Sequence, residues 1–284
     1  MKTQYWTHTF IIGFTALALH AGVPFNDLQG SGGIGYNPIA YTAGRYNNTG
    51  TNGINDVISL PQVGVWYVDF FESKLDWVSL SSSISIARRL ELSYAYGLIR
   101  GVGGDDTINT HTLGAKFNIL PENSWETTWV PAISVGARWK YTDTDLAKIL
   151  GLHSQGADFY AVATKLITQT PLPVLLSAGV QASDDLVYGV LGHNKYGASG
   201  FGSVSVLPLS NVAVGVEIKQ GVDIGENPSG VGFKNADYLN AHVGWLVNDR
   251  LSLIAAYGFT GDKDGGTDNF GLGQAVVASV QYGF

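Results

Sequence analysis

The last fourteen residues, GLGQAVVASVQYGF (271–284), alternate between two kinds of side chain. Large or apolar residues occupy one side of an extended segment, namely Val276, Ala278, Val280, Tyr282 and Phe284. The other side carries mostly small or polar residues. A period of two is typical of a strand whose two faces meet different surroundings. This stretch therefore predicts a terminal strand that continues to Phe284.

The same alternation recurs along the chain, as in RLELSYAYGLI (89–99), NVAVGVEIKQ (211–220) and RLSLIAAYGFT (250–260). In each case one face is aliphatic or aromatic, and the other is Gly, Ala or Ser with scattered charges. Lengths near ten residues suit tilted strands that cross an outer membrane. Twelve such segments are predicted, near 62–71, 75–87, 89–100, 110–120, 128–142, 156–168, 172–183, 198–207, 210–220, 236–247, 250–260 and 271–284.

The composition agrees with strands that face lipid. The 284 residues are 45% hydrophobic and only 14% charged, whereas about 25% charged is usual for a soluble domain. After the N-terminal stretch, no run approaches the ~18 apolar residues of a spanning helix. The net charge of −7 argues against nucleic acid as a partner. The absence of cysteine excludes disulfide scaffolds and thiolate metal sites.

The connections between the predicted strands alternate in length. Short turns such as Ala87–Arg89 and Asn248–Arg250 alternate with long polar loops such as GDKDGGTDNFG (261–271). Only PENSWETTW (121–129) is longer than the other connections on the short-turn side. Such alternation is typical of bacterial outer-membrane barrels. A soluble β-sandwich is the alternative, but the Gly, Ala and Ser face is too small for a hydrated exterior and too polar for a dry core.

The fold class predicted is therefore all-β, a transmembrane antiparallel up-and-down barrel of twelve strands. A closed sheet pairs its last strand with its first, because an open edge in hydrocarbon leaves backbone groups unsatisfied. We expect the barrel-assembly machinery to recognise the terminal Phe284. Aromatic residues near strand ends predict interfacial belts, and they include Trp66, Trp77, Tyr94, Tyr96, Trp129, Trp139, Tyr141, Trp245, Tyr257, Phe259 and Tyr282.

The N-terminal part divides into two regions. Residues 1–21 combine Lys2, an apolar core over 10–19 and small residues, which predicts a secretory signal peptide. Residues 22–61 are rich in Gly and Asn and are placed outside the wall, either as a plug in the lumen or in the periplasm. A strand over Ile39–Tyr46 would be a thirteenth, and a fourteen-strand barrel is the alternative count. Residues 62–284 form the barrel.

Several segments resemble an uncharacterised, domain-of-unknown-function family of outer-membrane barrel proteins from Gram-negative bacteria. They are GSGGIGYNPIA (30–40), RLELSYA (89–95), LGAKFNIL (113–120), VPAISVGARWKY (130–141), GADFYAVATKL (156–166), VAVGVEIKQ (212–220) and DRLSLIAAYG (249–258). The resemblance covers nearly the whole chain after residue 22. It implies the fold and the outer-membrane location, and it assigns no activity and no functional residues.

Alternation also predicts a basic stripe inside the barrel. Its candidate solute-binding residues are Lys116, Arg138, Lys140, Lys165 and Lys219. Rows of charge set selectivity in pores, and low-dielectric walls strengthen their field. Asp69, Glu91, Glu217 and His242 are also predicted to point inward. The alternative is a structural network of ion pairs and hydrogen bonds that fills the lumen.

The predicted function is a channel or transporter for small solutes, with anions favoured by the basic stripe. The alternative is a non-conducting structural or interaction barrel. A lipid-modifying enzyme has less support, because His153 beside Ser154 is the best available pair and no catalytic acid accompanies it. No catalytic residue, metal or cofactor is predicted. The expected partners are outer-membrane lipid, lipopolysaccharide and small solutes.

Overall fold

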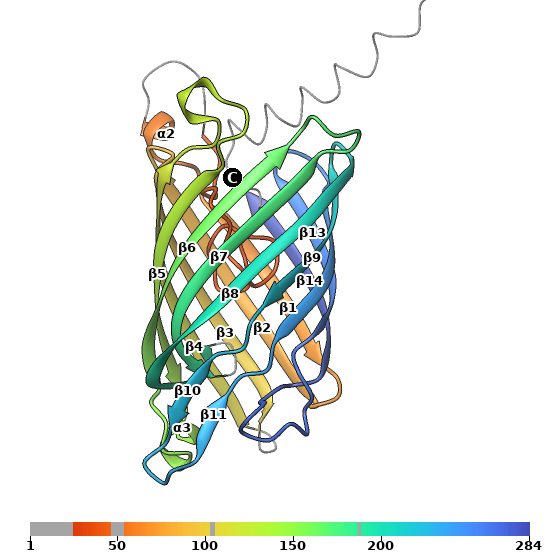
Figure 1. The fold of residues 1–284 in the computed structure, drawn as a ribbon. Helices are drawn as coiled ribbons and strands as arrows, with labels where there is room; N and C mark the ends of the chain where they lie inside the picture. The colour runs from red at the N-terminus through yellow and green to blue at the C-terminus, as the bar shows by residue number, and fades with distance from the viewer. Residues whose placement is uncertain (1–24, 47–53, 103–105, 187–188) are drawn as a thin grey trace, which may run out of the picture.

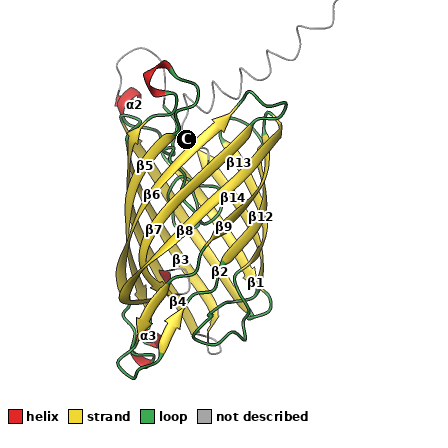
Figure 2. Cartoon of the chain, in the orientation of Figure 1, coloured by secondary structure: helices red, strands yellow, loops and turns green. Residues whose placement is uncertain are grey.

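The protein is a closed β-barrel whose wall contains twelve antiparallel strands (Figures 1 and 2). The structure, a computed structural model, describes residues 25–46, 54–102, 106–186 and 189–284. The wall strands are β1 (Gln62–Phe70), β2 (Leu75–Ile86), β3 (Leu90–Val102), β4 (Asp106–Leu120), β5 (Ala132–Asp143), β6 (Gln155–Ile167), β7 (Val174–Leu186), β8 (Leu191–Leu209), β9 (Val212–Lys219), β12 (Tyr238–Leu246), β13 (Leu251–Phe259) and β14 (Gln274–Gly283). The predicted twelve-stranded barrel is confirmed. The predicted signal peptide lies outside the described residues.

The barrel closes between its first and last strands. Eight consecutive residue pairs join β1 to β14 in antiparallel register. Val276 and Val280 on β14 and Phe284 just after it are each about half exposed, whereas Ser279 and Gln281 on the other face of β14 are buried. The terminal alternation thus corresponds to a lipid-facing side and a lumen-facing side, as the sequence predicts.

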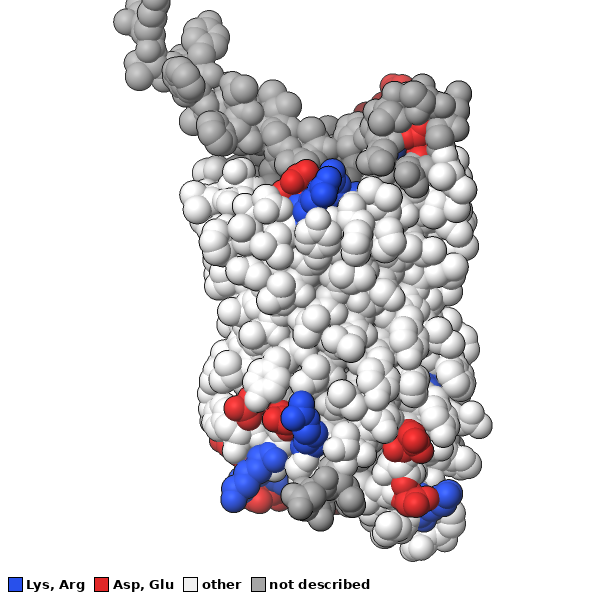
Figure 3. All heavy atoms as spheres, turned by 180° about the vertical axis from the view of Figure 1, so that it is seen from behind, with Lys and Arg blue, Asp and Glu red and all other residues white. Residues whose placement is uncertain are grey.

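The outer surface carries an apolar band around the middle of the barrel. On the face seen in Figure 3, the acidic and basic side chains lie towards the two ends, and the middle of the wall is uncharged. Exposed side chains such as Leu80, Leu113 and Ile218 belong to this surface. A band of this kind matches the hydrocarbon core of a membrane. The twelve strands therefore form a membrane-spanning wall.

Two tryptophans predicted for the interfacial belt face the lumen instead. Trp66 on β1 and Trp77 on β2 are only 2% and 5% exposed, while Tyr67, the neighbour of Trp66, is 44% exposed. Asp69, predicted to point inward, lies on the same outer side of β1 as Tyr67 and opposite Val276. Apolar residues occupy both faces of β1, so alternation alone could not identify the inner face.

The two ends of the barrel differ. The turns Ala87–Arg89 and Asn248–Arg250, the C-terminus and α2 (Ile54–Val57) lie at one end. The short turn at residues 71–74, α3 (Leu146–Ile149) and the hairpin of β10 (Asp223–Glu226) and β11 (Gly232–Lys234) lie at the other (Figure 1). The longer connection at the short-turn end contains a 3₁₀ turn, η1 (Ser124–Glu126). Strands β10 and β11 pair only with each other in a separate sheet, so the fourteen-strand alternative is wrong. None of the described helices has the length and apolar character needed to cross a membrane.

Candidate functional site in the barrel lumen

Residues 25–46, which we call the lumen segment, lie inside the barrel as irregular chain (Figure 1). Isolated bridges between Asn26 and Gly32 and between Gly33 and Pro38 fold the segment back on itself. Nearly all of its side chains are buried. Its described residues contain no strand of the wall, so the alternative strand over 39–46 does not form. The segment therefore occupies space that an open pore would leave to water.

Two buried glutamates of the wall hold the backbone of the lumen segment. Glu91 on β3 accepts hydrogen bonds from the backbone N–H groups of Gly32 (2.9 Å) and Ala43 (2.6 Å). Glu217 on β9 accepts one from Tyr36 (3.0 Å). Irregular buried chain needs partners for its N–H groups, and these carboxylates supply them. The inward charges predicted at 91 and 217 are therefore anchors for the segment.

Glycine in the lumen segment permits this close approach. A Cβ atom at Gly35 would overlap the Glu217 carboxylate. A Cβ atom at Gly32 would lie 3.0 Å from both a carboxylate oxygen of Glu91 and the ammonium nitrogen of Lys116. The Gly-rich composition of residues 30–35 thus lets charged wall side chains reach the backbone directly.

Arg138 on β5 holds the first turn of the lumen segment. Its guanidinium forms an ion pair with Asp27 and donates hydrogen bonds to Gln29 and to Ser31 Oγ (3.2 Å). Asp27 also accepts the N–H groups of Gln29 (2.9 Å) and Ser31 (3.0 Å). Burial raises the pKa of Asp27 to about 6, although the charges of Arg138 and Lys116 act in the opposite direction.

The other basic residues of the lumen also have partners within the protein. Lys116 pairs with Glu91 at 3.0 Å. Lys140 pairs with Asp158 and, at 2.6 Å, with Asp185. The ammonium group of Lys219 lies 4.6 Å from the centre of the Tyr36 ring, in a cation–π arrangement. These contacts are those of a filled, internally paired lumen.

Lys165, predicted to belong to the basic stripe, lies on the outer face of β6. It is opposite Leu176, which is 37% exposed, whereas the adjacent residue Thr164 is buried in the lumen. Its ammonium group pairs with Glu122 at 3.0 Å in the connection between β4 and β5. The inward placement of Lys165 was wrong because both faces of β6 carry apolar residues.

Four predicted basic residues, Lys116, Arg138, Lys140 and Lys219, do face the lumen. Carboxylates accompany them, and those buried beside them are Asp27, Glu91, Asp158, Asp185 and Glu217. Sequence analysis did not identify three of these, Asp27, Asp158 and Asp185. Had the inward-facing residues of β6 been assigned correctly, the alternation would have placed Asp158 in the lumen. Asp27 lies in irregular chain, where no periodic pattern shows which way a side chain points. A solute-binding role for the four residues that face the lumen stays a prediction.

One relay of buried side chains has the order of a hydrolase triad. Ser205 Oγ lies 3.0 Å from His242 Nε2, and His242 Nδ1 lies 2.9 Å from Asn240 Oδ1. Asn240 in turn donates to Glu217 at 3.0 Å. Ser205 and His242 are 1% and 2% exposed, so the relay supports Glu217 and offers no accessible nucleophile. Among the described residues, no group of three or more His, Asp or Glu side chains is placed to hold a metal ion.

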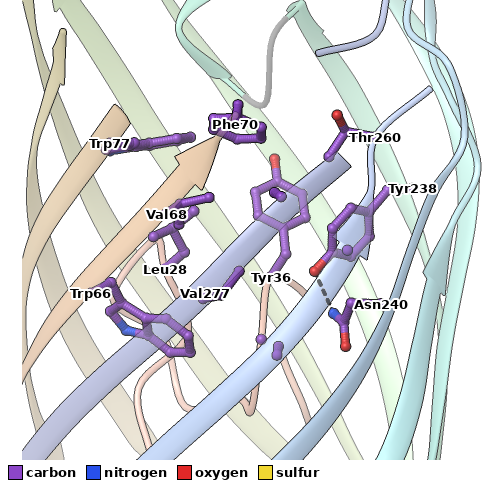
Figure 4. Close-up of a pocket in the computed structure, with 14 residues that line it drawn as sticks. Leu28, Tyr36, Trp66, Val68, Phe70, Trp77, Tyr238, Asn240, Thr260 and Val277 are labelled. Atoms are coloured by element: carbon purple, nitrogen blue, oxygen red, sulfur yellow. Dashed lines mark hydrogen bonds between the residues drawn. The ribbon is translucent and has the colours of Figure 1, made fainter. Parts of the chain in front are cut away.

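The lumen also contains an apolar pocket beside the lumen segment. Its cavity volume is about 40 Å³. Figure 4 shows Tyr36 of the lumen segment together with side chains of β1, β2, β12 and β14. The labelled residues that line it are Leu28, Tyr36, Trp66, Val68, Phe70, Trp77, Tyr238, Asn240, Thr260 and Val277. Sequence analysis did not anticipate an apolar region inside the barrel.

Solved structures with this fold are outer-membrane proteins. The KdgM porin aligns with a TM-score of 0.52 and 12% identity, over 78% of this chain and 99% of that one. The NanC porin gives 0.51 and 10% identity over 79% and 100%. The COG4313 outer-membrane channel from Pseudomonas putida F1 gives 0.50 and 12% over 79% and 95%. Similarity at this level shows the fold, that of a bacterial outer-membrane barrel.

No curated protein matches the sequence. Residues 22–271 match the family described as "Protein of unknown function (DUF3034)". This match covers most of the barrel and the whole lumen segment, and it confirms the resemblance to an uncharacterised outer-membrane barrel family. The chain therefore belongs to the DUF3034 family.

Proposed function

We propose that this protein is an outer-membrane channel for small solutes, closed by its own lumen segment. The observation that carries the proposal is the position of residues 25–46, which the wall holds through Glu91, Glu217 and Arg138. The KdgM and NanC porins have a similar barrel, which supports a pore as the use of this wall. In the closed channel, the lumen segment fills the path that a solute would take through the barrel.

The wall does not depend on the lumen segment for its backbone hydrogen bonds. The twelve strands pair in a closed ring that includes none of residues 25–46. The segment is attached through side-chain hydrogen bonds, ion pairs and packing, which local opening can break without unfolding the barrel. Displacement of the segment would therefore open the lumen and leave the membrane-spanning wall in place.

The barrel also suggests an orientation. Short turns of outer-membrane barrels face the periplasm and long loops face outside, so we infer that α2 and the C-terminus face the periplasm. Phe284, about half exposed at that end, is where the assembly machinery would bind. The long loops at the other end would lie among lipopolysaccharide.

The closed interaction barrel remains the second candidate, and the filled lumen favours it. The anion preference proposed for the channel depends on Lys116, Arg138, Lys140 and Lys219. Because buried carboxylates accompany these residues, we expect any preference for anions over cations to be weak. The reversal potential across a salt gradient measures this preference in the same bilayer experiment.

A reversible crosslink between the lumen segment and the wall tests the channel. Ser83 Oγ on β2 donates a hydrogen bond of 2.7 Å to Asn26 Oδ1, and the chain has no cysteine of its own. A variant with both Asn26→Cys and Ser83→Cys therefore has two thiols on contacting positions and no others, and loss of both free thiols on oxidation shows that the disulfide has formed. We expect the oxidised variant to be silent in planar lipid bilayers and the reduced variant to conduct like the wild type.

The two single-cysteine variants are the controls, and oxidation should not affect them. Equal conductance of the oxidised and reduced double variant would refute closure by the segment. If neither the wild type nor variants that release the segment conduct, although both insert as folded barrels, the closed interaction barrel is correct.

A further inference from the structure

The end of the barrel opposite α2 carries a second element inside the wall. We propose that the chain between β7 and β8 forms an outer flap, which closes the lumen independently of the lumen segment. Among the described residues, the outer flap consists of Asp185, Leu186 and residues 189–192. Its role as a gate rests on the proposed channel function, whereas the closure itself does not.

The outer flap is separate from the ladder of hydrogen bonds that closes the barrel. The register between β7 and β8 is regular up to Ser183 and Gly197. It then shifts, so that Asp185 pairs with Gly192. The described ladders that join β6 to β7 and β8 to β9 include no residue of the outer flap. Because a break in register bends the paired strands, the outer flap can move without opening the wall.

The outer flap crosses the lumen and reaches the opposite wall. Strands β2 and β8 lie on opposite sides of the twelve-stranded ring. Gly189 and Val190, just before β8, nevertheless line one small cavity together with side chains of β2, namely Trp77 and Ser79. This cavity measures only about 10 Å³, which is room for one water molecule at most. The outer flap therefore leaves no gap there through which a solute could pass.

Neighbouring loops hold the outer flap in this position. Asn235, just after β11, donates a hydrogen bond of 2.7 Å to the carbonyl oxygen of Asp185. The backbone N–H of His153 donates one of 2.8 Å to the carbonyl oxygen of Gly192. The apolar side chains of the outer flap are all buried, namely those of Leu186, Val190 and Leu191. The outer flap is thus packed chain, with contacts on several sides.

Lys140 fastens the outer flap to the wall. Its ammonium group lies between two buried carboxylates, Asp158 of β6 and, at 2.6 Å, Asp185 of the outer flap. A Cβ atom at Gly189 would lie 2.7 Å from Lys140 Cδ, so the outer flap also packs on the stem of this lysine. Without the cation, a wall carboxylate and a flap carboxylate would face each other while buried, which disfavours the closed position.

This attachment is distinct from the anchors of the lumen segment. Arg138 holds the lumen segment through Asp27, whereas the ion pairs of Lys140 join the wall to the outer flap. The two elements meet where Leu28 and Gln29 of the lumen segment line the same small cavity as the outer flap. The lumen therefore has two closures in series, and each can be released by itself.

Maleimide labelling of a cysteine beneath the outer flap, in the purified barrel in lipid nanodiscs, tests this closure. Thr112 on β4 is buried and lines the cavity beside Gly189, and the chain has no cysteine of its own. We expect Lys140→Met to accelerate labelling at Thr112→Cys at least about tenfold, because it leaves two buried carboxylates without their cation. Asp158→Asn is the matched control. It keeps the pair of Lys140 with Asp185, so labelling should stay within about twofold of the parent.

Labelling at Thr42→Cys, in the lumen segment, shows whether the two closures are separate. We expect Lys140→Met to leave it within about twofold of the parent, because the described ion pairs of Lys140 include no residue of the lumen segment. Circular dichroism checks that every variant remains a folded barrel. The proposal is overturned if Lys140→Met labels Thr112→Cys no faster than Asp158→Asn does, or if it exposes both cysteines together.

Conductance distinguishes failure of the outer flap from failure of the channel. Lys140→Met should raise the open probability in planar bilayers. The oxidised pair Asn26→Cys and Ser83→Cys should silence this variant, because the lumen segment still fills the barrel. Exposure of Thr112→Cys without any current refutes only the channel. Current that the disulfide controls, with Thr112→Cys still protected in Lys140→Met, refutes only the outer flap.

Discussion

The two sides of the lumen make different contacts with the lumen segment that lies between them. On β3 to β9, inward charges such as Glu91, Arg138 and Glu217 contact the lumen segment directly. On β1 and β2, Trp66 and Trp77 contribute aromatic surface and leave a pocket beside the same segment. The difference suggests that the polar side fixes the segment in place, whereas the apolar side only packs beside it.

The largest expected effect comes from breaking the Arg138–Asp27 pair on the polar side. Arg138→Met leaves Asp27 buried without its partner, which costs about 3–5 kcal/mol for a buried pair. We expect the population of displaced segment to rise at least a hundredfold. Thr42→Cys provides the reporter, because Thr42 is buried in the segment and a maleimide would label it only after displacement.

The double variant Arg138→Met with Asp27→Asn is the control. Asn at position 27 removes the unpaired buried charge and keeps an oxygen that can accept the N–H groups of Gln29 and Ser31, so most of the protection of Cys at position 42 should return. Unchanged labelling in Arg138→Met would mean that the polar side does not hold the segment.

The same two sides show what could be predicted from the sequence. Twelve alternating segments and the terminal strand were sufficient to predict the wall, because a barrel repeats one signal many times. The prediction of which strand face points into the lumen failed where both faces of a strand are apolar. On β6 a one-residue error in parity placed Lys165 inside and concealed Asp158, and on β1 the same ambiguity concealed Trp66.

The contacts of the lumen segment could not be predicted from periodicity. Residues 25–46 have no regular structure, so nothing in their spacing shows which side chain meets which strand. The Arg138–Asp27 pair joins residues 111 positions apart in the chain. Such a pair depends on the path of irregular chain through a closed barrel, and only the three-dimensional structure gives that path.

A smaller effect is expected from the relay behind Glu217. Ser205→Ala removes the hydrogen bond to His242, and loss of one such bond costs about 1 kcal/mol. Because both residues belong to the wall, only part of this energy affects docking, and displacement of the lumen segment should increase by at most about fivefold, measured by labelling at Thr42→Cys. The wild type should not react with a fluorophosphonate. Covalent labelling at Ser205 that His242→Ala abolishes would instead identify a hydrolase.

The pH dependence of Asp27 should be smaller still. The pKa of Asp27 is about 6 with the segment in place, against 3.8 for a free carboxyl group, so the docked segment binds a proton more tightly than the displaced one. Acidification therefore favours docking, and the open probability should fall about fourfold between about pH 7.5 and about pH 5.5. Asp27→Asn should remove this part of the dependence. A rise in open probability on acidification that needs Asp27 would contradict the assignment.

The smallest effect on the segment should come from the apolar side itself. Val68 on β1 lines the pocket, and Val68→Ala removes two methyl groups there without touching an anchor of the segment. We expect labelling at Thr42→Cys to stay within about twofold of the parent, even though deleting buried methyl groups lowers barrel stability by roughly 1 kcal/mol or more. If Val68→Ala released the segment as strongly as Arg138→Met, packing against the apolar side would restrain the segment as much as the polar anchors do.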